Sequence, residues 1–151
     1  MTKADPNYAR FQRGNFVVSD LDRALTFYRD VLGFKLDFVK DSPDDSYSYD
    51  VFEIDRSKKI RFAVLSTEDQ VRVMALTEIE DTVLAPCPDP RRSAIVVEVG
   101  DVDRVVTGAD GIGCHVYREE ELHTHDGRVG REVGIVDWDG NLTVIYHIPE
   151  K

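Results

Sequence analysis

Histidines are the first side chains to consider for chemistry, because imidazole nitrogens bind transition metals and exchange protons near neutral pH. His123 and His125 are separated by one residue and stand next to Asp126. On a β-strand this spacing points both rings to one face, and such a pair can begin a zinc or iron site. The alternative, which we favour, is a polar loop with exposed histidines. His115 and His147 stand alone in strand-like segments, where a single histidine is usually a surface or edge residue.

Two cysteines, Cys87 and Cys114, are the only thiols in the chain. They form neither a CxxC pair nor a disulfide framework, and two isolated thiols are usually small buried hydrophobic residues. Asp50, Glu53 and Glu132 could act as general bases, but no spacing selects one of them. The reactive side chains alone therefore define no active site, and the elements that would position them carry the stronger signal.

The segment Gly14–Phe34 reads as a strand followed by a short helix. A β-rich run ends at Ser19 and Asp20, which are both good N-caps, and Asp22 follows Ser19 by three residues as in a capping box. Gly33 can adopt the left-handed conformation that ends a helix. Between these signals, apolar residues recur at the spacing of one helical face: Leu21, Ala24, Leu25, Tyr28, Val31 and Leu32.

The same pattern occurs again 81 residues later (102 − 21 = 81). Ser93–Asp101 is a second β-rich run that ends in an N-capping aspartate. Adding 81 to the first four positions of the helical face gives Val102, Val105, Val106 and Ala109. The chain therefore contains an internal repeat.

Each half continues with β-type segments after its helix, so each half reads β-α-β-β-β. In the first half these are Phe34–Lys40, Ile60–Leu65 and Val71–Ile79, and a polar excursion with the aromatic stretch Tyr47–Phe52 separates the first two. In the second half they are Cys114–Glu119, Val129–Asp137 and Leu142–Ile148, with a tight Asp-Gly turn before the last.

This organisation predicts an α+β protein with one domain, residues 13–148, built from two modules. Module 1 covers residues 13–79 and module 2 covers residues 93–148. Residues 80–92 contain three prolines and read as an extended linker. Residues 1–12 read as a loose N-terminal arm.

Two motifs in these modules are characteristic of one large protein family. The first is Val-x-Asp-Leu-x-x-Ala-x-x-Phe-Tyr-x-x-Val-Leu-Gly-Phe in Val18–Phe34. The second is Asp137–Leu142, where Trp138 replaces the usual proline of Asp-Pro-Asp-Gly-Asn-Leu. Over residues 13–148 the chain resembles the vicinal oxygen chelate superfamily, which includes glyoxalase I, extradiol dioxygenases and bleomycin-resistance proteins. The resemblance implies tandem βαβββ modules whose cupped mixed sheets surround a cavity.

The resemblance also implies where a metal would be bound. Metal-using members place one ligand at the start of the first strand and one on the last strand of each module. In this chain those positions are Arg13, Ala75, Ala94 and Val144, with Ala63 as the alternative to Ala75. A guanidinium group and aliphatic side chains do not bind a divalent cation. We therefore predict no metal centre and no cofactor.

The expected function is binding of a small organic molecule in the cavity between the modules, without the usual metal. Such a cavity needs apolar and aromatic walls, and the candidate lining residues are Arg13, Tyr47, Tyr49, Phe52, Phe62, Ala75, Ala94, Trp138, Val144 and Tyr146. The alternative is an enzyme of the superfamily, a lyase, isomerase, epimerase or dioxygenase. It would use a non-standard metal site at His123 and His125, or Arg13 as an electrophile.

The charge balance limits the partners of this chain. Its 151 residues include 19 Lys+Arg and 29 Asp+Glu, for a formal net charge of −10. This charge disfavours nucleic acid and anionic lipid and favours a cationic ligand, whereas Arg13 would favour an anion locally. No apolar run approaches the roughly 20 residues of a membrane span, and the first residues lack the apolar core of a secretion signal. We expect a cytoplasmic homodimer.

Overall fold

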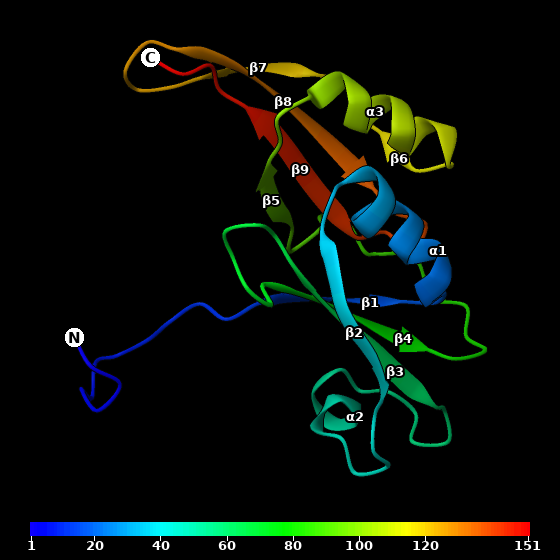
Figure 1. Cartoon of the computed structure of the whole chain (residues 1–151). Coiled ribbons are helices and arrows are strands. Elements are labelled where there is room, and N and C mark those ends of the chain that lie inside the picture. Colours follow the sequence, from blue (N-terminus) through cyan, green and yellow to red (C-terminus); the bar gives the residue numbers. More distant parts are fainter.

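The computed structural model describes residues 1–151. They form two modules of strands and short helices (Figure 1). The elements of the first module are β1 (Gly14–Val18), α1 (Leu21–Leu25), the π-helical turn η1 (Thr26–Val31), β2 (Lys35–Asp41), α2 (Tyr47–Val51), β3 (Ile60–Ser66) and β4 (Met74–Ile79). Those of the second are β5 (Ile95–Glu98), α3 (Val102–Gly111), β6 (His115–Val116), β7 (Glu120–His123), β8 (Val129–Val136) and β9 (Leu142–His147).

Each module forms its own open sheet. The strand orders are β1-β4-β3-β2 and β5-β9-β8-β6, and β7 also pairs with β8. In both sheets the first strand of the module runs parallel to the last, β1 with β4 and β5 with β9. The α+β fold predicted from the sequence, with a repeated β-α-β-β-β module, is confirmed.

The first helix of each module begins at an aspartate. The side chain of Asp20 accepts a hydrogen bond from the Arg23 amide at 3.0 Å, and Asp101 accepts one from the Arg104 amide at 3.0 Å. Of the two N-caps considered for the first helix, Asp20 is therefore the one used. The hydroxyl of Ser19 bonds instead to a carboxylate of the second module.

The first helix widens into a π-helical turn before it ends. The Leu32 amide donates to the Phe27 carbonyl at 2.7 Å, and the Phe34 amide donates to the Tyr28 carbonyl at 3.0 Å. Gly33 follows with a φ of 99°, which confirms it as the left-handed residue that stops the helix. Within this turn both Phe27 and Tyr28 are fully buried.

One hydrophobic core joins the two modules. It combines residues of α1, η1 and α3 with the helix-facing sides of both sheets, for example Leu76 and Ile145. The helices α1 and α3 lie next to each other (Figure 1), and a Cβ atom at Gly108 of α3 would lie 3.0 Å from Val31. Because side chains alternate along a strand, the other face of each sheet points away from this core.

A hydrogen-bonded joint also connects the modules. The turn between β8 and β9 presents Asp137, whose Oδ2 accepts a hydrogen bond from the Tyr28 hydroxyl at 2.7 Å. In the same turn Asn141 Nδ2 donates to the Val17 carbonyl at 2.9 Å. Burial raises the pKa of both Asp137 and Tyr28. These contacts fix the β8–β9 turn of the second sheet against β1 and η1 of the first module.

The clearest difference from the sequence interpretation lies between β2 and β3. The sequence interpretation places the aromatic stretch Tyr47–Phe52 in a polar excursion and assigns it no helix, whereas Tyr47–Val51 form the short helix α2. Only Tyr49 of the helix is buried, in a small second core with Ile54, Ile60 and Ile79. One helical turn can bury a single aromatic residue and leave its neighbours exposed. A half-buried strand would instead bury every second residue.

The segment between the modules, residues 80–94, contains no helix or strand. Leu84 packs against the small second core. Arg91 Nε donates to the Gly140 carbonyl at 3.3 Å, and its Nη1 donates to the Tyr117 hydroxyl at 3.0 Å. The linker is therefore attached to both modules.

The N-terminal residues 1–12 project away from the body of the molecule (Figure 1). Their hydrogen bonds are local, such as that from the Tyr8 amide to the Asp5 carbonyl at 3.0 Å. Hydrogen bonding to the body begins at Arg13, whose Nε donates to the Arg72 carbonyl at 3.2 Å, and continues at Gly14, whose amide donates to the Val73 carbonyl at 3.0 Å. None of the helices is long and apolar enough to cross a membrane.

Candidate functional site

A groove with a volume of about 680 Å³ lies where the two modules meet. Gly14 at the start of β1 is close to Ile95 at the start of β5, and a Cβ atom at Gly14 would lie 3.4 Å from Ile95 Cγ2. These two positions correspond in the 81-residue repeat (95 − 14 = 81). The residues that line the groove are Phe11, Gly14, Phe34, Thr67, Glu68, Asp69, Gln70, Val73, Met74, Ala94, Ile95, Val96, Val97, Glu98 and Tyr146.

The free edge of β5 runs along the groove. This strand is the outermost of its sheet and pairs only with β9, so the backbone groups on its other edge have no strand partner. Ile95 and Val97 pack against the core, while Val96 and Glu98 point outward and Val96 is 66% exposed. An unpaired strand edge beside apolar side chains is a surface that extended or flat ligands can contact.

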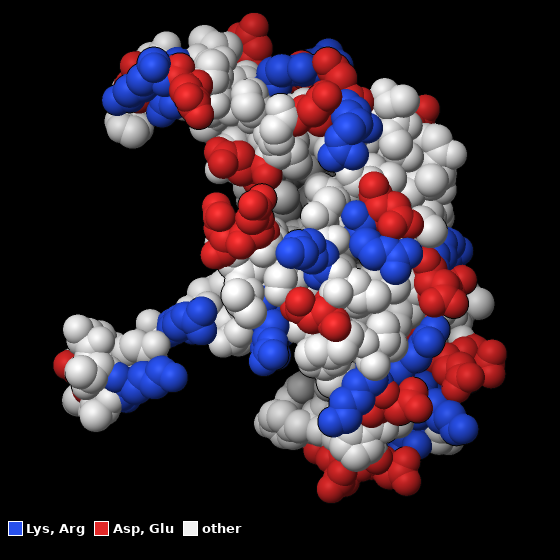
Figure 2. Space-filling model, viewed as in Figure 1, with Lys and Arg blue, Asp and Glu red and all other residues white.

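The groove carries uncompensated negative charge. Its lining includes Glu68, Asp69 and Glu98 but no lysine, arginine or histidine. None of the three carboxylates takes part in an ion pair. Figure 2 shows acidic side chains along the hollow at the left of the molecule, between the β7–β8 hairpin and the N-terminal arm. The local field therefore favours a positively charged group.

The four positions implied as metal ligands fall into two equivalent pairs. Arg13 directly precedes β1, and Ala75 on β4 pairs with Asn15 of that strand. Ala94 directly precedes β5, and Val144 on β9 pairs with the second residue of that strand. Each pair thus combines the start of the first strand with the last strand of its module, which is the arrangement that the resemblance implies.

A comparison with known families decides the affiliation of the chain. The sequence profile of the Glyoxalase/Bleomycin resistance protein/Dioxygenase superfamily matches residues 10–145. The chain belongs to this superfamily. No curated protein matches the sequence.

Solved structures of the superfamily share the fold. A glyoxalase family protein from Bacillus cereus is 18% identical over 99% of this chain and 100% of its own, with a TM-score of 0.69. The trypanothione-dependent glyoxalase I of Leishmania major is 20% identical over 93% of this chain and 87% of its own, with a TM-score of 0.59. An antibiotic-binding protein from Streptomyces is 18% identical over 95% and 98%, with a TM-score of 0.57. At such identities the likeness establishes the fold and not the activity.

The residues at the four positions implied as metal ligands do not fit a metal ion. Ala75, Ala94 and Val144 have no donor atom in their side chains. The Arg13 guanidinium is a cation, and its Nε donates to the Arg72 carbonyl at 3.2 Å. Across residues 1–151, no group of three or more His, Cys, Asp or Glu side chains is arranged to hold a metal.

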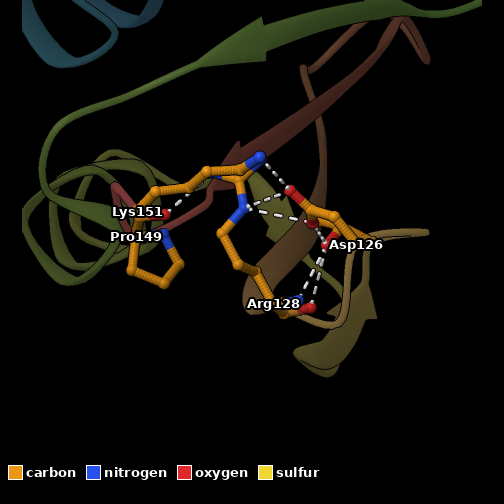
Figure 3. Close-up of polar contacts among 5 residues, drawn as sticks. Asp126, Arg128, Pro149 and Lys151 are labelled. Atoms are coloured by element: carbon orange, nitrogen blue, oxygen red, sulfur yellow. Dashed lines mark hydrogen bonds and ion pairs between the residues drawn. The ribbon is translucent and has the colours of Figure 1, made fainter.

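The two histidines considered as a non-standard metal site lie at the tip of the β7–β8 hairpin, outside the groove. His123 is the last residue of β7, and His125 is exposed in the turn that follows. The Thr124 hydroxyl and the Arg128 guanidinium bind Asp126 and hold the pKa of that carboxyl well below its usual range. Figure 3 shows this carboxylate between Arg128 and the C-terminal lysine. It is therefore already engaged by cations and is not a free third ligand.

Two of the residues expected to line the cavity are brought together in the groove, Ala94 and Tyr146. Phe62 lies outside the groove, with its ring centroid 6.0 Å from that of Phe38. Phe52 borders a separate shallow cavity beside the linker.

Three other aromatic residues expected in the cavity lie outside this groove. Tyr47 on α2 is 73% exposed. Tyr49 is buried in the small second core, where its hydroxyl donates to the Lys58 carbonyl at 2.6 Å. Trp138 packs against the main core with the Arg23 guanidinium 5.1 Å from its ring centroid. Aromatic residues occupy cores and cavities alike, so residue type alone does not separate the two.

The polar wall of the groove was not anticipated from the sequence. Thr67–Gln70 form the loop between β3 and β4, and Glu98 ends β5. The repeat could have identified the loop. The β3–β4 loop of module 1 is equivalent to the β8–β9 turn of module 2, Asp137–Asn141. The signal for Glu98 is a single charge at the end of an otherwise apolar run, Ala94–Val97.

Proposed function

We propose that this protein binds a small, positively charged organic molecule in the groove between its modules, without a metal ion. The observation that carries the proposal is a groove that combines apolar walls with three unpaired carboxylates and no cationic side chain. Its volume of about 680 Å³ lies within the usual range of small-molecule sites. An ammonium or guanidinium group would balance the carboxylates, and an attached apolar group would bury against Val96 and Tyr146.

Binding is better supported than catalysis. The groove lining contains neither histidine nor cysteine, and its hydroxyl-bearing residues, Thr67 and Tyr146, are not hydrogen-bonded to a base within it. Arg13, the candidate electrophile, is not among the lining residues and donates to a backbone carbonyl instead. That a structural neighbour is an antibiotic-binding protein is consistent with a binding role for this fold.

The proposal is tested by calorimetric titration with three matched probes: phenethylammonium, phenethyl alcohol and 3-phenylpropionate. We expect the cation to bind most tightly, and its affinity to fall as salt is added. Glu98→Gln should weaken cation binding roughly fivefold, equivalent to about 1 kcal/mol for one exposed charge pair. Asp45→Asn, which removes an equal charge at an exposed position outside the groove, should leave the affinity unchanged.

The same titrations distinguish the enzymatic alternatives. Binding should persist after treatment with EDTA and should be the same in a variant in which His123 and His125 are replaced by alanine. An affinity that requires added zinc, nickel, iron or manganese would contradict the proposal. So would preferential binding of the anionic probe that disappears in Arg13→Ala, because this result would assign the site to an anion.

A further inference from the structure

The free edge of β5 exposes four backbone groups without a hydrogen-bond partner. The Val99 amide, directly after the strand, donates to the Tyr146 carbonyl of β9 at 2.9 Å. Because backbone groups point alternately to the two sides of a strand, those of Val97 also face β9, whereas those of Val96 and Glu98 face away from it. The structure contains no hydrogen bond to these outward groups. Two amides and two carbonyls are therefore available to a ligand.

The groove follows this edge of the strand. Five consecutive residues, Ala94–Glu98, line it. A groove that lay on one face of β5 would be lined by every second residue only, because side chains alternate between the two faces. A molecule in the groove therefore lies beside the unpaired amides and carbonyls as well as against side chains.

The side chains beside the edge define a spacing for the ligand. Val96 is 66% exposed, and Glu98 is exposed two residues further on, on the same face of the sheet. Side chains at opposite positions of neighbouring strands contact each other. On an added strand, an apolar side chain would therefore lie beside Val96, and a basic side chain two residues away would lie beside Glu98. Glu68 and Asp69 add negative charge to the same groove.

We propose that the cationic ligand of this groove is a short extended peptide that pairs with β5 as an additional strand and carries an apolar and a basic side chain two residues apart. Backbone hydrogen bonds to Val96 and Glu98 give the affinity, and the side-chain spacing gives the specificity. This inference rests on the proposed function, because it assigns a chemical class to the ligand of the same site. The four residues of β5 span roughly 13 Å, which suits a peptide of about five residues.

The surroundings of the edge favour a free peptide over a strand of a folded partner protein. The edge lies in the hollow between the β7–β8 hairpin and the N-terminal arm, which both project from the body (Figures 1 and 2). A separate short chain can enter this hollow. A strand on the surface of a folded protein would bring its neighbouring segments against the hairpin and the arm.

Calorimetric titration with two capped peptides tests the spacing. The peptides are acetyl-Lys-Thr-Val-Thr-Lys-amide and acetyl-Thr-Lys-Val-Lys-Thr-amide, which have the same composition and charge, and each reads the same in both directions. Only the first places lysine two residues from valine. We expect it to bind about fivefold more tightly. Glu98→Gln should remove this preference, and Asp45→Asn, outside the groove, should keep it.

Amide hydrogen exchange, followed by NMR, tests the strand pairing. In the chain alone, the amides of Val96 and Glu98 should exchange rapidly, and the Val97 amide, which faces β9, should exchange slowly. Saturation with the first peptide should slow the Val96 and Glu98 amides about tenfold or more and leave Val97 unchanged. Phenethylammonium has no amide group and should not produce this pattern.

The outcomes separate this inference from the proposed function. If phenethylammonium binds but the two peptides bind equally, or if the Val96 and Glu98 amides stay unprotected with the first peptide bound, the peptide inference is wrong and the proposed function stands. If neither phenethylammonium nor the peptides bind, both are wrong. Slow exchange of the two amides without peptide would show that another copy or the arm already covers the edge, and it would also overturn the inference.

Discussion

At the scale of single residues, the two thiols occupy contrasting environments. Cys114 is buried in the core, and burial raises the pKa of its thiol from 9.0 to about 11, with Asp137 nearby adding to the effect. Cys87 is exposed beside the Gly140 carbonyl, 3.4 Å from its Sγ. Both were predicted from the sequence to be small buried hydrophobes; this is confirmed for Cys114 and wrong for Cys87. Local sequence did not show that the linker carries Cys87 across the surface.

The raised pKa of Cys114 makes stability depend on alkaline pH. The pKa of the Cys114 thiol is higher in the folded state than in the unfolded state. The stabilisation from the buried, protonated thiol is therefore fully present below about pH 9 and is lost as pH rises toward 11. We expect the free energy of unfolding, measured by urea titration, to fall between these pH values less steeply in Cys114→Ala than in the wild type. Cys87→Ala serves as the control and should follow the wild type. An equal slope in Cys114→Ala and the wild type would contradict this assignment.

Residue types predicted the superfamily more readily than the site. The motif residues Gly33 and Asp137 have the roles that the pattern predicts. Gly33 ends the helix in a left-handed conformation and the Asp137 carboxylate accepts a hydrogen bond within its own turn, and both roles depend on local backbone geometry. Tyr49 and Trp138 pack against the cores rather than in the groove, because the burial of an aromatic residue depends on which other segments pack against it. Glu98 was missed for the same reason, since its role depends on the β3–β4 loop of the other module.

At the scale of elements, the repeat places equivalent caps at the starts of α1 and α3. Asp20 and Asp101 differ by 81 positions, and each accepts a backbone hydrogen bond of 3.0 Å. Replacing either with alanine leaves first-turn amides without that acceptor and should cost about 1 kcal/mol. Urea unfolding measures the loss. Asp45→Ala, at an exposed position that caps no helix, should change stability by less than either cap variant, and the reverse order would refute the capping role.

Element types were predictable where periodicity was long and regular. The strands and the two main helices follow from apolar spacing and from the caps. The helix α2 did not, because five residues carry too little periodicity to distinguish a helical turn from a strand. The strand β7 was missed because its polar residues, Glu120–His123, are held by pairing with β8 rather than by burial.

At the scale of the whole molecule, the joint between Tyr28 and Asp137 couples the two modules. Tyr28→Phe removes the donor and leaves Oδ2 of the buried carboxylate with only the Asn141 amide at 3.1 Å. We expect a loss of roughly 1–3 kcal/mol in urea unfolding. Tyr47→Phe is the matched control, because its hydroxyl belongs to a residue that is 73% exposed.

Two optical signals report whether the modules unfold together. Trp138 is the single tryptophan and lies beside the joint, so its fluorescence follows that contact, while circular dichroism follows both sheets. We expect the two transitions to coincide in the wild type. A wild-type fluorescence change at clearly lower urea would show that the joint opens first and would contradict the coupling of the modules.

The same joint has a consequence for how the chain matures during synthesis. Its partners are separated by 109 residues, and the related contact from Ser19 to Asp139 spans 120. A nascent chain is synthesised from its N-terminus. The Tyr28 hydroxyl and one side of the first helix therefore stay exposed until the turn between β8 and β9 has been synthesised. The shared core is completed only after the turn at Asp137–Asn141 has been synthesised, so until then the first module is the part that a chaperone would meet exposed.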